Sequence, residues 1–81
     1  MAQAYVVLHC KTGMEEWVIR NLKKIAGVKE VSGVYSLYDI IAKVEAKDSV
    51  TLEQIITKQI RKVQYIRTTM TLLVFDEQEK L

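Results

Sequence analysis

The chain is short, and its composition is that of a folded domain. It has 81 residues, of which 49% are hydrophobic and 27% charged, with no proline and three glycines. The net charge of +2 at pH 7 is small, whereas nucleic-acid-binding domains usually concentrate basic residues in a patch. All apolar runs are far shorter than the ~20 residues of a membrane-spanning helix. We therefore expect one globular domain, residues 1–81 with a flexible tail over 76–81, that contacts neither nucleic acid nor a membrane.

A domain of this size has a small core. It buries only about 60–65% of the surface that its unfolded chain exposes. The single cysteine, Cys10, cannot form an intrachain disulfide, and no Cys/His cluster is present to hold zinc. Self-association is the remaining source of extra stability. A lone cysteine without an N-terminal signal sequence also indicates a reducing, cytoplasmic location.

Six regular elements are predicted from the spacing of apolar residues. The spacing of Thr12 and Glu15 is that of a capping box, in which the Thr12 hydroxyl accepts a hydrogen bond from the Glu15 amide. Gly27 is placed to end the first helix in a left-handed conformation. The predicted order is a strand over 4–10, a helix ending at Gly27, strands over 28–35 and 39–45, a helix beginning at Asp48, and a strand over about 67–75.

The two halves of the chain are similar where each helix meets the next strand. Residues 22–29 read LKKIAGVK and residues 60–67 read IRKVQYIR. The order is therefore βαβ followed by βαβ, and right-handed crossovers then give a four-stranded antiparallel sheet with both helices on one face. We predict an α+β, ferredoxin-like βαββαβ fold.

This fold leaves one sheet face uncovered, although the strands are apolar on both faces. In the first strand, Val6, Leu8 and Cys10 would face the helices while Tyr5, Val7 and His9 face outward. In the last strand, either assignment exposes an apolar row, and we place Thr69, Thr71, Leu73 and Phe75 outward. A contiguous apolar patch usually marks an interface. We expect a homodimer through this face, with Tyr5, Val7, His9, Leu73 and Phe75 in the contact.

The sequence contains no catalytic constellation. His9 is the only histidine, and by itself it supports neither a catalytic triad nor a metal site. Cys10 at a strand end is typical of a small buried hydrophobe. No Gly-rich loop or metal-ligand cluster is present, so we expect no cofactor, no metal site and no enzymatic activity.

The turn at Ser36-Leu37-Tyr38-Asp39 is the segment most suggestive of function. Turn aspartates are often structural, accepting from nearby amides. With YDIIAKVEA after the turn and RTTMTL in the last strand, the chain resembles the ligand-binding half of the leucine-responsive/asparagine regulator (Lrp/AsnC) family, also called the regulation-of-amino-acid-metabolism domain. The resemblance covers about residues 4–74. No helix-turn-helix is present, so the chain is most similar to stand-alone members.

The resemblance implies dimers through the open sheet face, higher assemblies such as octamers, and an amino-acid effector bound where dimers meet. It places that effector at Ser36, Leu37, Tyr38 and Asp39, with Asp39 pairing to an ammonium group and with Thr69 and Thr71 as weaker candidates. The family usually has glycine at position 36 and in the turn at Tyr65. It also implies a sensor that modulates full-length regulators. A cofactor-free dimeric α/β-barrel-type enzyme using His9, and a purely structural assembly partner, stay open as alternatives.

Overall fold

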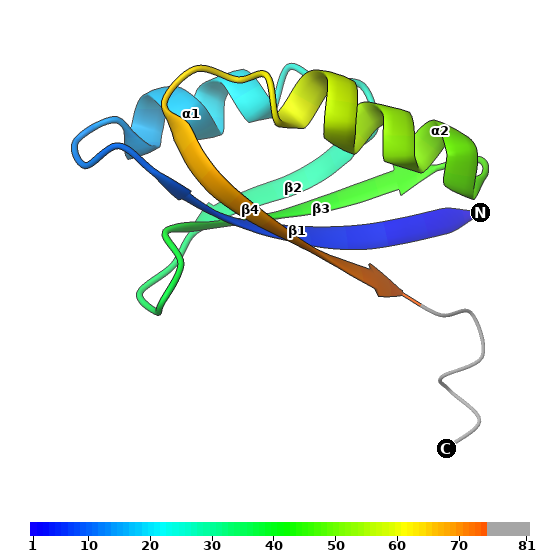
Figure 1. Cartoon of the computed structure of the whole chain (residues 1–81), viewed down its shortest axis with the longest axis horizontal. Helices are drawn as coiled ribbons and strands as arrows, with labels where there is room; N and C mark the ends of the chain where they lie inside the picture. The colour runs from blue at the N-terminus through cyan, green and yellow to red at the C-terminus, as the bar shows by residue number, and fades with distance from the viewer. Residues whose placement is uncertain (75–81) are drawn as a thin grey trace.

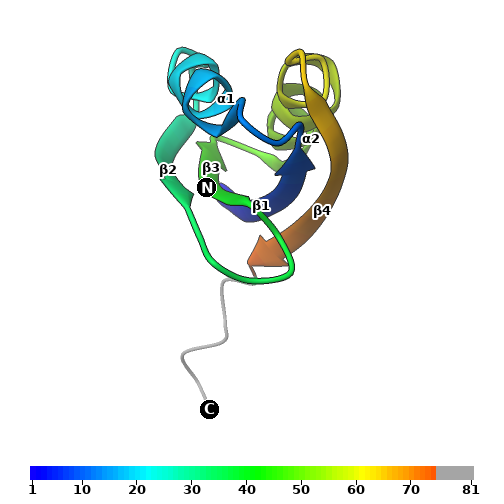
Figure 2. The same ribbon diagram turned by 90° about the vertical axis from the view of Figure 1, so that its left-hand side faces the viewer.

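The computed structural model describes residues 1–74 and has the predicted architecture. Four strands form one antiparallel sheet in the order β2-β3-β1-β4, and the helices lie side by side on one face of it (Figures 1 and 2). The α+β, ferredoxin-like fold is therefore confirmed, whereas the tail 76–81 lies outside the described residues. The elements are β1 (Ala2–Cys10), α1 (Glu15–Leu22), β2 (Val28–Gly33), β3 (Ile40–Ala46), α2 (Ser49–Gln54), a π-helical continuation η1 (Ile55–Ile60), and β4 (Ile66–Val74).

The core lies between the helices and the covered face of the sheet. Val18 and Leu22 of α1 are buried, and their spacing of four residues places them on one face of the helix. The covered face of β1 contributes every second residue, as expected for a strand. The buried residues are Ala4, Val6, Leu8, Cys10, Val18, Leu22, Val31, Ile40, Ala42, Val44, Leu52, Ile55, Ile56 and Ile60. Within residues 1–74, no helix is both long and apolar enough to cross a bilayer.

The start of α1 differs from the predicted capping box. Met14 is the N-cap residue, and no side chain caps the helix. The Glu15 carboxylate accepts instead from the amide of Gly13, at 3.0 Å, where φ is +93°. The helix therefore begins two residues later than the capping box predicts, with Met14 in place of Thr12 at the N-cap. The second helix does begin at a side-chain cap, because Asp48 Oδ1 accepts from Thr51 N at 2.7 Å.

The structural register shows which residues of β4 share a face with those of β1. Val6 pairs with Thr71, and Ala4 pairs with Leu73. Because directly paired residues point to the same side of a sheet, Thr71 and Leu73 lie on the helix side, where the buried Val6 and Ala4 lie. The expectation that Leu73 lies on the open face is therefore wrong. Phe75, predicted to join it there, lies outside the described residues.

The two helix-to-strand turns adopt the same unusual backbone conformation. Gly27 has φ of +99° and Tyr65, at the corresponding place in the second half, has φ of +76°. A Cβ on Gly27 would lie 2.7 Å from Ile55 Cδ1 and 3.0 Å from the Glu45 carbonyl oxygen, so only glycine fits. Tyr65 instead packs edge-on against Trp17, with ring centroids 5.0 Å apart. This aromatic contact offsets part of the cost of a left-handed conformation at a non-glycine residue.

Candidate functional site

The open face of the sheet carries an apolar surface over β1 and β4. Tyr5 pairs with Leu72 and Val7 with Met70, which places these four side chains side by side, opposite the helices. Leu72 is 48% exposed and Met70 46% exposed. We call Tyr5, Val7, Met70 and Leu72 the open-face patch. The predicted outward orientation of Tyr5 and Val7 is confirmed.

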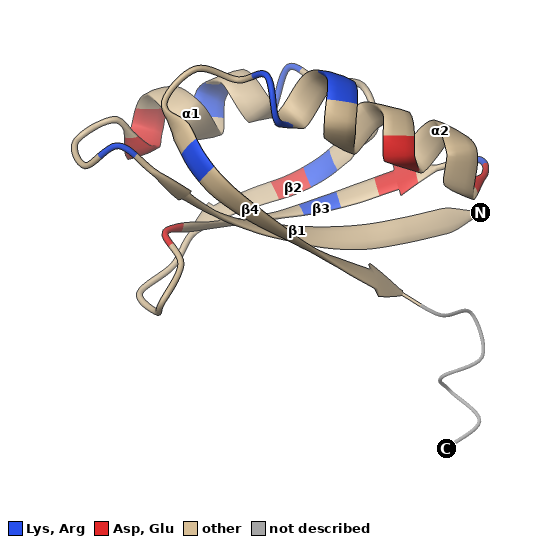
Figure 3. Ribbon diagram, in the orientation of Figure 1, with Lys and Arg blue, Asp and Glu red and all other residues tan. Residues whose placement is uncertain are grey.

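Charge is distributed unevenly across this same face. The strand β1 carries no Lys, Arg, Asp or Glu, and β4 carries only Arg67 (Figure 3). On β3, Lys43 pairs with Tyr5 in register, and its Nζ lies 3.6 Å from Glu45 Oε2. The open face is therefore apolar toward the β4 edge and bears an ion pair toward β3.

The loop between β2 and β3 curls beneath the open face (Figure 2). Ser36 sets its shape, since the Ser36 hydroxyl accepts from the Tyr38 amide at 3.1 Å and lies 3.3 Å from the Tyr38 carbonyl oxygen. Within residues 1–74, Tyr65 is the only non-glycine residue with positive φ, so Ser36 does not need the conformation that favours glycine. The serine thus builds the turn through its side chain.

Asp39 fastens this loop to the end of β1. Its Oδ2 accepts from the Cys10 amide at 3.0 Å, and its own amide donates to the Leu8 carbonyl oxygen at 3.0 Å. The pairing of β1 with β4 shifts register between His9 and Cys10, next to this attachment. These contacts give Asp39 a structural role, one of the two roles weighed for it from the sequence.

His9 and Tyr38 connect the loop to the open-face patch. The His9 Nδ1 lies 3.6 Å from Asp39 Oδ2, and its ring stacks on Tyr38 with centroids 4.7 Å apart and planes at 24°. The Tyr38 hydroxyl reaches the sulfur of Met70 at 4.0 Å. His9 faces outward as predicted, and its neighbours make the loop and the patch one continuous surface.

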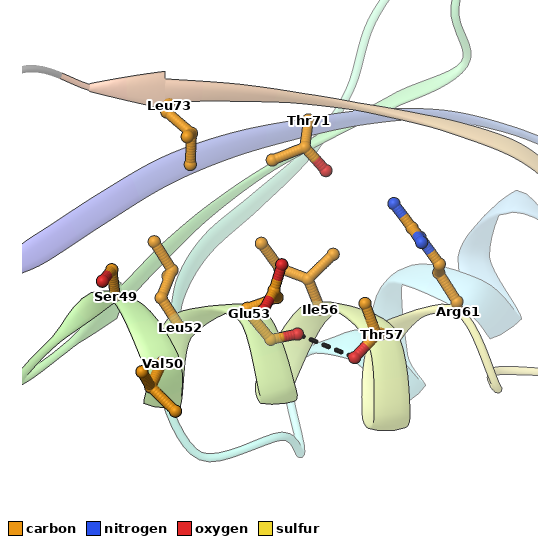
Figure 4. Close-up of a pocket in the computed structure, with 9 residues that line it drawn as sticks. All are labelled: Ser49, Val50, Leu52, Glu53, Ile56, Thr57, Arg61, Thr71 and Leu73. Carbon is orange, nitrogen blue, oxygen red and sulfur yellow. Dashed lines mark hydrogen bonds between the residues drawn. The ribbon is translucent and has the colours of Figure 1, made fainter.

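Thr69 and Thr71 do not join this surface. They pair with Leu8 and Val6 and so face the helices, and Figure 4 shows Thr71 and Leu73 directed toward α2. Within one chain the sheet separates these threonines from Ser36, Leu37, Tyr38 and Asp39, so their expected outward orientation is wrong, whereas their part in a site between dimers stays a prediction. Leu37 is 86% exposed at the loop tip, away from the attachment at Asp39.

The remaining titratable groups of this region are few. Cys10 is a free, buried thiol, and burial foremost, with the nearby carboxylates of Glu15 and Asp39, raises its pKa. A raised pKa lowers the thiolate fraction and makes the sulfur less nucleophilic. In the described part of the chain, no three His, Cys, Asp or Glu residues come together as metal ligands do.

Sequence reasoning missed the stacking of His9 on Tyr38. Both residues were singled out, one for a strand and one for a turn, but their contact depends on how the loop folds under the sheet. The presence of aromatic rings in a turn next to an apolar face was the available signal. The π-helical segment η1 gave no such signal, since its apolar spacing also suits an α-helix.

The chain matches known proteins over nearly its whole length. Residues 3–80 match the model of the Lrp/AsnC ligand binding domain. The solved structure of FFRP-DM1 is 36% identical and covers 93% of this chain and 100% of its own, with a TM-score of 0.88. A transcriptional regulator of Neisseria meningitidis, solved in complex with L-Met, is 11% identical, with a TM-score of 0.82 over 95% of this chain and 51% of its own. At that identity it shares the fold alone.

A different kind of protein also contains a related segment. The homocitrate synthase of Saccharolobus solfataricus is 51% identical over 57 residues, which is 70% of this chain. The chain spans 12% of the length of that enzyme. The segment is therefore found in a metabolic enzyme as well as among ligand-binding domains. From the family model and FFRP-DM1 together, the chain belongs to the Lrp/AsnC ligand-binding domain family.

Proposed function

We propose that this chain is an amino-acid sensor that dimerises through its open sheet face and binds its effector where dimers meet. The observation that carries the proposal is the continuity of the loop 34–39 with the open-face patch, through Tyr38 and Met70. An effector held by the loop therefore acts on a surface that also governs association. Membership in a family of ligand-binding domains favours a binding role over a catalytic one.

The open-face patch supports self-association on physical grounds. Its leucine, methionine and tyrosine side chains are between about a third and a half exposed in the single chain, and fully burying such a side chain contributes about 1.5–3 kcal/mol. In a twofold dimer each contact occurs twice. The Lys43–Glu45 pair at the β3 side would fix the orientation of the two sheets, because charges confer specificity more than affinity.

The loop offers groups suited to a zwitterionic ligand. Asp39 uses Oδ2 in its contacts with Cys10 and His9, and no hydrogen bond to Oδ1 is found within residues 1–74, so Oδ1 is available to an ammonium group. Tyr35 is fully exposed and Leu37 is 86% exposed. A second dimer would cover them and close the site around the ligand.

The sensing step would be a change in the population of oligomers. A ligand shifts an equilibrium only by as much as it prefers one state to the other. An amino acid that contacts two dimers at once would favour the higher assembly. In the cell, full-length regulators of the same family would then be the partners that respond, in the cytoplasm, where the free Cys10 stays reduced.

The test is light scattering after size exclusion, repeated with each common amino acid at millimolar concentration. We expect at least one amino acid to raise the mass or the thermal stability of the assembly. Asp39→Asn should weaken this response at least tenfold, because it removes the charge that pairs with the ammonium group. Glu16→Gln, the same change at an exposed acid of α1, is the control. Indifference of the wild-type assembly to every amino acid would overturn the sensor proposal.

The similarity to homocitrate synthase favours a second candidate. The chain would regulate a metabolic enzyme by pairing its open face with the related segment of that enzyme. Mixing the chain with the Saccharolobus solfataricus enzyme should then give a mixed complex in size exclusion, and Leu72→Lys in this chain should prevent it. Separate elution of the two wild-type proteins at all ratios would rule out this candidate.

A further inference from the structure

The two edges of the sheet differ in how well they are protected. The strands β2 and β4 lie at the edges. The short strand β2 carries the charged Lys29 and Glu30, and its pairing with β3 shifts register between Val28 and Glu30. Charged residues and bulges of this kind keep an edge strand from pairing with another chain. The β2 edge is therefore protected.

The strand β4 has none of these features beyond its second residue. It is nine residues long, and its only charged residue is Arg67, near its start (Figure 3). Residues 68–74 read TTMTLLV, without charge, glycine or proline, and they pair with β1 in unbroken register. Alternate residues of a strand direct their amide and carbonyl groups to the same side, so half of those in 68–74 point away from β1, where no strand within residues 1–74 lies. A long, regular edge of this kind is a template for a further strand.

The helix side of this edge contains a cavity. It lies between α2, η1 and β4 and has a volume of about 400 Å³, and Figure 4 shows Leu73 and Thr71 of β4 directed into it. Leu73 is 61% exposed although it faces the helices, and Val50, which also lines the cavity, is 65% exposed. The helices therefore leave the edge row of β4 partly uncovered. A strand added beside β4 would place alternate side chains over this cavity.

Thr71 adds an observation that is independent of exposure. Its Oγ1 is buried and has no hydrogen-bond partner in the described part of the chain, and the residue lies in a wall of the cavity. Buried hydroxyl groups normally have a partner. Because directly opposite residues of neighbouring strands share a face of the sheet, a Thr or Ser opposite Thr71 would supply one.

The charges around the cavity define one end of a partner. Four of the charged residues between positions 49 and 74 are basic and one is acidic: Lys58, Arg61, Lys62 and Arg67 against Glu53. Within residues 1–74 none of the basic residues forms an ion pair. Figure 4 shows Arg61 at the end of the cavity away from Leu73, with Glu53 between them. An acid in a partner is therefore favoured at the Arg61 end, which is the start of β4, and not beside Leu73.

We propose that β4 is the docking site for an extended segment of another protein, which adds to the sheet as a fifth strand antiparallel to β4. Antiparallel pairing is the slightly more stable arrangement. In strand addition, backbone hydrogen bonds give affinity and the pockets for alternate side chains give specificity. The interaction is formed by one chain and does not involve the loop 34–39, so it goes beyond the sensor function proposed above.

The faces of β4 define the sequence that such a segment needs. On the helix side, an aliphatic residue lies opposite Leu73, a Thr or Ser opposite Thr71, and an acid opposite Thr69, toward Arg61. On the other side, aliphatic residues lie opposite Met70 and Leu72. From its N-terminus the segment therefore reads aliphatic, aliphatic, Thr or Ser, aliphatic, acid.

The probe is the synthetic peptide acetyl-Lys-Val-Ile-Thr-Val-Glu-Thr-amide, titrated into the whole chain and followed by amide hydrogen exchange. In the free chain, alternate amides of residues 68–74 should exchange fast because they point away from β1. Saturating peptide should slow their exchange at least tenfold. Slow exchange of every amide of residues 68–74 in the free chain would mean that a second copy of this chain occupies the edge, and it would overturn the proposal.

Methylation of the peptide backbone tests for strand pairing itself. Two versions of the probe carry one N-methyl group each, on the Ile or on the adjacent Thr. Only one of these two amides points to β4 in an added strand, so one version should bind at least tenfold more weakly and the other less than threefold more weakly. Equal binding of the two versions would overturn the proposal.

Variants of the chain test the side-chain contacts. Leu73→Lys should weaken peptide binding at least tenfold, whereas Leu73→Val, which stays aliphatic, should weaken it less than threefold. A peptide with Gln in place of Glu should bind about two- to fivefold more weakly to the wild type, as expected for an exposed ion pair, and equally well to Arg61→Gln. Absence of binding at millimolar peptide, or equal binding by Leu73→Lys and the wild type, would overturn the proposal.

Discussion

The two faces of the sheet use neighbouring residues of the same strands for different purposes. On the covered face, Leu8 and Val6 are completely buried by the helices. On the open face, Tyr5 and Leu72 lie side by side and remain well exposed. The difference shows that the chain places apolar residues where none of the elements described within residues 1–74 covers them. A contiguous exposed apolar surface commonly marks an interface with another molecule.

The edge strand β4 makes the contrast sharpest. Its apolar Met70 and Leu72 face outward, while the polar Thr69 and Thr71 face the helices. A solvated face normally carries the polar residues, so Met70 and Leu72 are placed as if the open face were an interior, whereas Leu73 on the helix side remains 61% exposed. At the same edge, α2 and β4 leave space for the cavity lined by Thr71 and Leu73.

Truncation of Leu8 should have the largest effect on folding. Leu8→Ala removes a fully buried side chain from the core and should lower the free energy of unfolding by about 2–5 kcal/mol, since it leaves a cavity. Val7→Ala, on the open face of the same strand, should cost clearly less in a dilute sample. Urea denaturation monitored by the fluorescence of Trp17 measures both. Equal losses for the two variants would contradict the assignment of faces.

Introduction of a charge at Leu72 should separate dimerisation from folding. About half of the Leu72 side chain is exposed in one chain, and it occurs twice in a dimer, so its loss should cost about 1.5–3 kcal/mol, or about 10–100-fold in the dimer dissociation constant. Leu73→Lys, at the next residue but on the helix side, is the matched control. Sedimentation velocity over a dilution series should show dissociation for Leu72→Lys alone. Dissociation of the dimer in both variants would contradict the claim that only the open face of β4 forms the dimer contact.

The pKa of the Cys10 thiol gives a test of burial on the covered face, through the pH dependence of stability. Because burial raises its pKa in the folded chain above the ordinary value of 9.0, the folded state keeps the proton to higher pH. Its contribution to stability is therefore full below the unfolded pKa and is lost as pH rises through the folded pKa. Alkylation by iodoacetamide should be slower than for an unfolded peptide at the same pH. A rate equal to that of the peptide would contradict the burial of Cys10.

Removal of the Asp48 cap should have the smallest effect, and it should be confined to the helix side. The hydrogen bond from Thr51 lowers the pKa of the Asp48 carboxyl. This contribution to stability is present above the unfolded pKa and is lost as pH falls through the folded value. Asp48→Ala should therefore lower the melting temperature slightly at neutral pH and less in acid, without altering the dimer. A change in dimer mass would contradict the claim that the helix side does not contribute to dimerisation.

The fold could be predicted because the spacing of apolar residues within each helix and strand is a local property of the sequence. The alternation of β1 identified its buried residues correctly, and the spacing of apolar residues predicted the helix that buries Val18 and Leu22. The left-handed conformation predicted for Gly27 is confirmed by its positive φ, whereas the positive φ of Tyr65 was not predicted, because a tyrosine in such a conformation is uncommon.

The site was less predictable because its contacts are long-range. Leu73 was assigned to the wrong face because both rows of β4 contain apolar residues, and sequence alone does not say which row faces a helix. The contact of Asp39 with the Cys10 amide spans 29 positions in the chain, and the stacking of Tyr38 on His9 follows from it. The cavity at α2 depends on η1, a π-helical segment that apolar spacing does not distinguish from an α-helix.

The most direct test of the account is the mass of the wild-type chain in solution, measured by sedimentation equilibrium from high to low protein concentration without added amino acids. The open-face patch predicts a dimer or a multiple of it at micromolar concentration, with a single 9.3 kDa chain appearing only on dilution. A monodisperse monomer at every concentration would contradict the claim that the open face is an interface.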